Sequence, residues 1–156
     1  MKEFVARIWR NFPTPLRRLS VRLMNTRFTV TAGAIVLDNK ERVLLLQHRF
    51  RGGSGWGIPG GFIKPREQPH EAIKRELREE VGLEVTDMRI VCSRTFKRVK
   101  QVEILFCCRT KGDAEPRSAE IKKADWFSLD QLPPGLPREQ ERLLKSILVD
   151  GANYPD

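Results

Sequence analysis

Cysteine and histidine are scarce in this sequence, and their spacing argues against two common kinds of site. The three cysteines, Cys92, Cys107 and Cys108, form no C-x-x-C pair, and their odd number does not suit a disulfide framework. Neighbouring Cys107 and Cys108 would point to opposite faces of a strand, which argues against a shared metal ion. His48 and His70 have no partner pattern. We therefore expect buried, reduced thiols in a cytoplasmic protein.

Long apolar runs are also missing. No stretch approaches the roughly 18–20 apolar residues that cross a bilayer, and arginines interrupt the apolar residues near the N-terminus, so no secretory signal is expected. The sequence shows no internal repeat, low-complexity tract or linker. Its 156 residues, 40% hydrophobic and 31% charged, are typical of one soluble globular domain with a core of its own.

Acidic residues are nearly absent from the first part of the chain. Residues 1–28 hold seven basic side chains and one acidic side chain, which accounts for +6 of the net charge of +9. Apolar residues at helical spacing predict a helix over residues 2–12 and, with Thr14 as N-cap, a second helix over residues 15–25. Residues 1–26 are thus predicted to form a basic amphipathic arm. Two interpretations stay open: packing on the body or on a second subunit of a homodimer, and contact with an anionic membrane surface or RNA.

The rest of the chain alternates between strand-like and helix-like patterns. Strands with helices on both sides predict an α/β fold of the α+β kind, an α/β/α sandwich with a mixed β-sheet. The predicted strands cover residues 27–37, 42–47, 84–95 and 101–109 and a short segment that ends at residue 127; residues 69–81 and 137–149 are predicted helices, and residues 51–61, with six glycines, are a predicted loop.

The helix predicted over residues 69–81 has recognisable ends. Gly82 suits a left-handed C-cap. Gln68 stands at the N-cap position, where Ser, Thr or Asp would stabilise the helix better. Glu71 precedes Arg75 by four residues, which predicts an ion pair on the helix surface.

Three carboxylates share one face of that helix. Glu76, Glu79 and Glu80 are spaced i, i+3 and i+4, which places all three on a single stripe. Like charges so arranged repel one another, and folding does not require them. A hard divalent cation, which prefers oxygen ligands, is the simplest physical reason to keep them together.

The segment Gly61–Leu83 resembles the signature of the Nudix hydrolase family. Gly61 is followed after five residues by Glu67, and after seven more by the run RELREEVGL over residues 75–83. Every fixed position of the signature is filled, so a chance match is negligible, unlike that of a lone short glycine pattern. The resemblance implies a Nudix-type α/β/α sandwich over residues 27–156, after the helical arm of residues 1–26.

The resemblance also implies a reaction and a set of roles. Nudix hydrolases cleave pyrophosphate bonds, and Mg²⁺ can neutralise the phosphate charge and lower the pKa of a bound water. By resemblance, the metal ligands are Glu76, Glu79, Glu80 and the Gly60 carbonyl, and Mn²⁺ is an alternative ion. One glutamate also serves as general base, and which one stays open. Glu67 and Arg75 are expected to support the site by pairing with the glutamates and holding the loop against the helix.

Outside the signature, the candidates each have an ordinary alternative. Glu120 lies six residues before Trp126, where many relatives carry an extra catalytic or metal-binding acid; a plain loop glutamate is the alternative, and Glu103 is a weaker candidate. Arg49 and Arg51 border the glycine loop and are candidate phosphate contacts, with solvated arginines as the alternative. Trp56 is a candidate for stacking on a base, or it packs beside the Pro-Gly-Gly turn.

The substrate is less well determined than the reaction. Residues 94–101 lack the proline and the tyrosine typical of ADP-ribose and dinucleoside-polyphosphate hydrolases, and no SQPWPFP segment like that of NADH pyrophosphatases follows. The function expected is Mg²⁺-dependent hydrolysis of a nucleoside diphosphate linked to another moiety, such as a nucleoside triphosphate or a nucleotide sugar. The alternatives are an RNA 5′-end pyrophosphohydrolase and a non-catalytic nucleotide-sensing domain.

Overall fold

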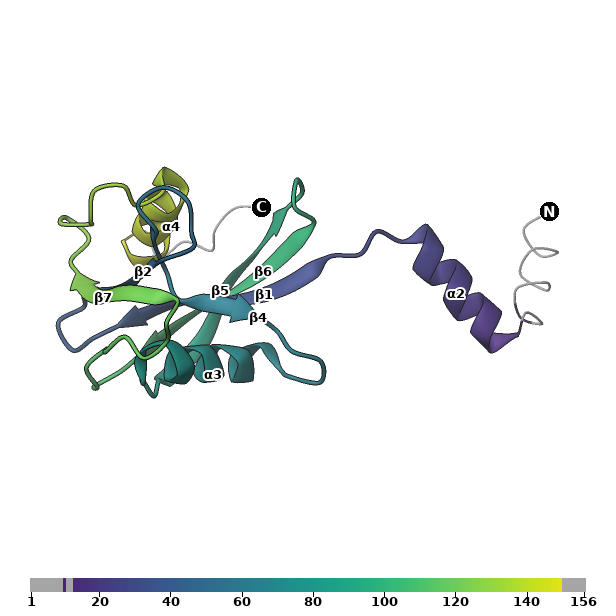
Figure 1. Ribbon diagram of the computed structural model, residues 1–156, viewed down its shortest axis with the longest axis horizontal. Coiled ribbons are helices and arrows are strands. Elements are labelled where there is room, and N and C mark those ends of the chain that lie inside the picture. Colours follow the sequence, from purple (N-terminus) through teal and green to yellow (C-terminus); the bar gives the residue numbers. More distant parts are fainter. Residues whose placement is uncertain (1–9, 11–12, 150–156) are drawn as a thin grey trace.

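The computed structural model of the protein describes residue 10 and residues 13–149. Its body has three layers (Figure 1), with helix α3 on one face of a β-sheet and helix α4 on the other. The predicted α/β/α sandwich with a mixed sheet is therefore confirmed. In chain order the elements are α2 (Thr14–Met24), β1 (Thr29–Leu37), β2 (Val43–His48), β3 (Trp56–Gly57), β4 (Gly60–Phe62), α3 (Pro69–Val81), β5 (Thr86–Phe96), β6 (Gln101–Arg109), β7 (Ile121–Phe127) and α4 (Arg138–Leu148).

The sheet is built around one parallel pair of strands. Its order is β3-β2-β1-β6-β5, with β4 paired to β1 and β7 paired to β2. β1 and β6 run parallel from Thr29↔Gln101 to Leu37↔Arg109, and the other pairs are antiparallel. A parallel pair needs a long connection, and here the connection contains both the glycine-rich segment and α3, which packs against β1 and β4.

Alternation along the strands divides the core into two halves. On β1, Val36 faces α3 whereas Ile35 faces α4, because successive residues of a strand point to opposite sides. Cys108 and Cys107 follow the same rule on β6, as predicted, and the three cysteines are free thiols. The buried residues are Ala72, Ile73, Leu77, Glu80 and Val81 in α3, and Leu143, Leu144 and Ile147 in α4.

The ends of α3 confirm one prediction and correct another. Gly82 adopts the left-handed conformation, with φ of 70°, and caps the C-terminus as predicted. The expected surface ion pair between Glu71 and Arg75 is wrong. Instead, the Glu71 carboxylate accepts a hydrogen bond from the backbone N–H of Gln68 at 2.9 Å. Glu71 therefore caps the helix N-terminus and compensates for the weak capping residue at Gln68.

Two further predictions change in detail. The second helix of the arm begins at Thr14 and is preceded by Pro13, so Thr14 is not the N-cap. The helix predicted over residues 2–12 lies almost wholly outside the described residues. Residues 51–61, expected to form a loop, contain the short strands β3 and β4. None of the described helices is long and apolar enough to cross a membrane.

Candidate active site

The glycine-rich segment after β2 is held close to the sheet and to α3. Gly60 pairs with Gly33 of β1, and a Cβ on Gly60 would lie 2.6 Å from the Ala32 carbonyl oxygen. A Cβ on Gly61 would collide with the carboxylate of Glu76. Only glycine at these two positions lets the backbone of β4 lie against both β1 and the acidic face of α3.

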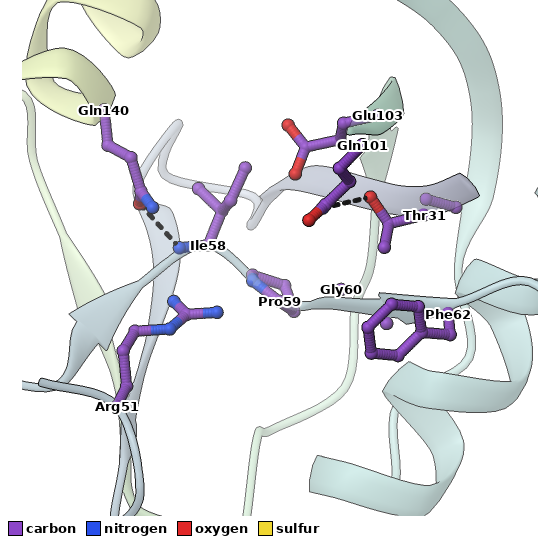
Figure 2. A pocket seen from close by; sticks show the side chains of 11 residues that line it. Thr31, Arg51, Ile58, Pro59, Gly60, Phe62, Gln101, Glu103 and Gln140 are labelled. Atoms are coloured by element: carbon purple, nitrogen blue, oxygen red, sulfur yellow. Dashed lines mark hydrogen bonds between the residues drawn. The ribbon is translucent and has the colours of Figure 1, made fainter. Parts of the chain in front are cut away.

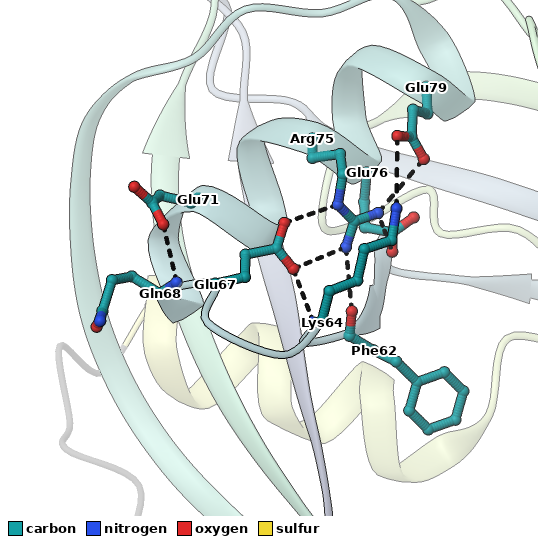
Figure 3. Close-up of polar contacts among 8 residues, drawn as sticks. All are labelled: Phe62, Lys64, Glu67, Gln68, Glu71, Arg75, Glu76 and Glu79. Carbon is teal, nitrogen blue, oxygen red and sulfur yellow. Dashed lines mark hydrogen bonds and ion pairs between the residues drawn. The ribbon is translucent and has the colours of Figure 1, made fainter.

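Arg75 of α3 is surrounded by acceptors (Figure 3). Its Nε donates a hydrogen bond to Glu67 at 2.7 Å, and its Nη1 donates to Glu76 at 2.8 Å and to Glu79 at 3.3 Å. Its Nη2 donates to Glu67 at 3.0 Å and to the Phe62 carbonyl at 3.1 Å. The hydrogen bonds from Arg75 are the main reason that the pKa of Glu67 falls to about 2. Arg75 thereby joins β4, the following loop and α3 in one ionic network.

Glu80 differs from its two neighbours on the helix because its carboxyl group is buried. The residue is only 7% exposed, and its Oε2 has no hydrogen-bond partner among the described residues. Burial raises the pKa of Glu80 to about 8; Glu76, Glu120 and Glu79 act in the same direction, whereas Arg51 opposes them. A buried carboxylate without a partner is costly, so the position favours a proton or a cation.

The three glutamates lie on one face of α3, but their carboxylate groups do not point to a common centre. Within residue 10 and residues 13–149, no three carboxylate, imidazole or thiol groups already lie close enough together to hold a metal ion. The reason is visible in Figure 3, where Glu76 and Glu79 turn toward Arg75. Their chemistry nevertheless fits Mg²⁺, which takes hard oxygen ligands, and the unpaired oxygen of Glu80 offers it an acceptor.

A cavity of about 200 Å³ lies beside the glycine strand (Figure 2). Arg51 points into it, and the guanidinium lies so close to Gly57 that a Cβ there would collide with it. Although much of the Arg51 residue is exposed, desolvation of its guanidinium lowers its pKa, and the charges of Glu80 and Glu103 act in the opposite direction. The cavity wall includes Thr31, Arg51, Gly60, Phe62, Glu103 and Gln140.

The remaining predicted residues lie at the edge of this region. Glu120 is exposed, and its backbone carbonyl accepts a hydrogen bond from the Arg49 N–H at 2.8 Å. Arg49 is likewise exposed. Trp56 is half-buried and packs edge-on against Phe127, with ring centroids 5.3 Å apart and planes at 82°. This contact agrees with a packing role for Trp56 beside the turn.

Two contacts of the site are absent from the predictions made from the sequence. Gln140 of α4 accepts a hydrogen bond from the Ile58 N–H at 3.0 Å, which ties the C-terminal helix to the glycine-rich segment. Glu103 pairs with Arg94 at 2.7 Å while lining the cavity. Gln140 is one polar residue among many in an amphipathic helix, so only the tertiary fold reveals its contact.

Comparison with known proteins identifies a family model and several relatives that match this chain. A family model described as the NUDIX domain matches residues 27–147. The NAD-capped RNA hydrolase NudC of Pseudomonas aeruginosa is 36% identical over 117 residues, which cover 74% of this chain and 41% of that protein. The chain spans less than half the length of the curated relatives it matches, between 40% and 47% of those compared.

Solved structures share the same architecture. The NUDIX domain of Shewanella oneidensis NrtR, in complex with ADP ribose, has a TM-score of 0.69 and 19% identity and covers 94% of this chain and 98% of its own. An ADP-ribose pyrophosphatase from Streptococcus suis has a TM-score of 0.61 and 27% identity and covers 75% of this chain and 89% of its own.

Proposed function

The chain belongs to the Nudix family, and we propose that it hydrolyses, with Mg²⁺, a pyrophosphate bond in a nucleoside diphosphate linked to another moiety. At the level of the family, the predicted enzyme class is confirmed; the activity of this chain and its substrate form the proposal. One observation carries it: the buried Glu80 carboxyl group, whose Oε2 has no hydrogen-bond partner among the described residues, lies on the same helical face as Glu79 and as Glu76, which lies against Gly61 of the glycine strand.

The ligands in this proposal come from α3 and β4. Glu76, Glu79 and Glu80 would hold the ion through their carboxylates, and the Gly60 carbonyl would add a fourth oxygen. When bound, Mg²⁺ or Mn²⁺ would neutralise the phosphate oxygens and make a water molecule more acidic. To reach the ion, the carboxylates of Glu76 and Glu79 would turn from Arg75, which keeps its two bonds to Glu67.

Other side chains would bind the substrate and assist the reaction. The Arg51 guanidinium points into the cavity and is a ready donor to phosphate oxygens. Glu120 lies within electrostatic reach of Glu80 and would add an acid at the rim. Arg49 would contact phosphates only from the exposed edge. One glutamate among Glu76, Glu79, Glu80 and Glu120 would accept the proton of the attacking water, because the reaction needs a base near the metal.

A panel of nucleoside triphosphates, nucleotide sugars and dinucleotides tests this proposal by metal-dependent release of phosphate or mononucleotide. We expect Mg²⁺-dependent turnover that falls at least about a hundredfold in Glu79→Gln or Glu80→Gln. Glu84→Gln is the matched control, because Glu84 is an exposed glutamate that pairs with Arg78. Full activity of both variants, with the circular dichroism of the wild type, would contradict the assigned roles, as would no turnover on the whole panel.

A second candidate substrate is an NAD-capped RNA end. The P. aeruginosa relative bears that activity in its name, and the basic arm of residues 1–26 would suit an RNA chain. Against it stand the missing SQPWPFP segment and the small share of that relative covered. Comparing kcat/KM on free NAD and on an NAD-capped RNA separates the two candidates, and the non-catalytic alternative is excluded by turnover of either.

The domain division, a homodimer and the cytoplasmic location stay predictions.

A further inference from the structure

Helix α2 carries an apolar face that nothing in the described structure covers. None of its residues is buried, and Figure 1 shows the helix standing away from the layered body beyond the start of β1. Leu16, Leu19 and Leu23 are spaced i, i+3 and i+7, which places them on one side. Leu23 is 76% exposed and Met24 83%. Such a cluster on a helix in water indicates a missing partner.

The other side of α2 is cationic. Arg17, Arg18 and Arg22 line a shallow hollow together with Val21, and the eleven residues of the helix contain no acidic side chain. Arginine at this density on one face, beside leucines on the other, is the composition of a helix that lies in a membrane interface.

We propose that α2 lies flat on the surface of a bilayer that contains anionic lipid, with its leucines among the acyl chains and its arginines at the headgroups. Only this partner satisfies both faces at once. A nucleic acid would neutralise the arginines but leave the leucines in water, and a second copy of α2 would cover the leucines but leave the arginines without an anionic partner. Eleven residues span about 16 Å, roughly half of the hydrocarbon thickness, so the helix rests on the membrane and does not cross it.

Vesicle flotation of the full chain tests this proposal. We expect binding to vesicles of phosphatidylcholine with about one third phosphatidylglycerol, and at least tenfold weaker binding to pure phosphatidylcholine. Arg18→Gln and Arg22→Gln should each weaken the partition coefficient about fivefold at low salt, and Leu19→Gln with Leu23→Gln should weaken it at least about tenfold. Val21→Gln is the matched control: it removes an apolar side chain from the arginine face of the same helix and should change binding less than twofold.

One outcome would overturn the proposal: no binding of the wild type to the anionic vesicles at low salt. Two further measurements would then identify the partner. Tight binding of a single-stranded RNA that the leucine substitutions leave unchanged would make RNA the partner, and a dimer in light scattering that dissociates in the double leucine variant would make a second copy the partner. Because the arginine variants keep the apolar face, they test the proposal even if the leucine variants lose their helix.

Discussion

Two arginines of this protein are each enclosed by carboxylates, Arg75 on α3 and Arg94 on β5 beside α4. Arg75 bonds to Glu67, Glu76 and Glu79, and its side chain is 17% exposed. Arg94 pairs with Glu103 at 2.7 Å and with Glu139 at 3.3 Å, and its side chain is 12% exposed. The geometry of the two clusters is therefore similar. Their surroundings differ, because only the Arg75 cluster contains glutamates that the proposed reaction needs.

The difference separates an ionic network that organises a reactive site from one that joins structural elements. Arg94 connects β5, β6 and α4, and its guanidinium also lies 4.8 Å above the ring of Phe96, so all of its partners stabilise the fold. Arg75 instead bonds to Glu76 and Glu79, whereas the buried Oε2 of a third glutamate, Glu80, has no hydrogen-bond partner among the described residues. Similar ion pairs thus organise the proposed active site around Arg75 and stabilise the fold around Arg94.

The sharpest way to break this comparison is to remove each arginine in turn. Arg75→Gln should lower kcat/KM about a hundredfold, because the loop that carries Glu67 loses the two hydrogen bonds that hold it against the acidic face of α3, and Arg75 keeps these bonds when Glu76 and Glu79 turn to the ion. Arg94→Gln should change kcat/KM less than about tenfold. Both should lower the free energy of unfolding by about 1–3 kcal/mol, because each leaves half-buried carboxylates without a charged partner. Steady-state kinetics and urea denaturation of the two variants measure these effects.

Equal activity losses at equal stability losses would contradict the distinction between the clusters. Arg75→Lys serves as the conservative control: it retains the charge but not the fork that reaches Glu67 twice. It should recover part of the lost activity, and recovery should appear in kcat rather than in KM if Arg75 positions the acids and does not bind substrate.

A second test sharpens the contrast between partnered and unpartnered glutamates by varying the pH without metal. The pKa of Glu80 is about 8 in the folded chain, against 4.5 for an ordinary glutamate. Between those values the unfolded chain releases a proton that the folded chain keeps, so the contribution of Glu80 to stability is greatest below pH 4.5 and is lost as the pH rises to about 8. We expect Glu80→Gln to remove this loss and to be about 1–2 kcal/mol more stable than the wild type at pH 8.

Urea denaturation in EDTA at pH 5 and pH 8.5 gives the measurement. Glu84→Gln should retain the wild-type pH dependence, since Glu84 is exposed beside Arg78. The same pH dependence in Glu80→Gln and wild type would show that the pKa of Glu80 is that of an ordinary glutamate. It would remove the main support for the Glu80 carboxylate as a ligand of the metal ion.

The smallest expected effect concerns Glu71, which, like Glu80, is a glutamate of α3 outside the Arg75 cluster. Glu71→Ala should lower the free energy of unfolding by about 0.5–1 kcal/mol, because the Gln68 N–H loses its acceptor. It should leave kcat/KM unchanged within about twofold. Lys74→Ala, at an exposed position of the same helix, is the matched control. A loss of activity in Glu71→Ala would extend the reactive cluster to the first turn of the helix.

The two arginine clusters also show what the sequence can predict. The carboxylate partners of Arg75 all lie between Glu67 and Glu79, inside the Nudix signature, so the resemblance to that family predicted these ion pairs but not the bond from Arg75 to the Phe62 carbonyl. The ion pair expected between Glu71 and Arg75 failed because Glu67, on the preceding loop, takes two of the Arg75 donors and leaves Glu71 to the backbone. Spacing along a helix indicates which side chains are close enough to pair. Which pair forms depends on the other acceptors within reach of the same donor.

The Arg94 cluster and the cavity could not be predicted in this way. Glu139 is 45 residues from Arg94, and Gln140 is 82 residues from its partner Ile58. Each contact requires the sheet and α4 to be in place, and no local pattern marks the residues involved. The fold class followed from strand and helix periodicity because layers depend on patterns of many residues, whereas single polar contacts depend on one side chain each.

The central parallel pair of strands has a consequence for the order of folding. Thr29 pairs with Gln101 and Leu37 with Arg109, and a pairing over so many intervening residues forms slowly because a long loop must close first. The hairpin of β5 and β6 and the helix α3 need only local contacts. During synthesis, β1 can therefore form its parallel pairing only after β6 has left the ribosome. Because Gly60 is held by β1, we expect the glycine strand to reach its final position only after that closure, in the slowest step of folding.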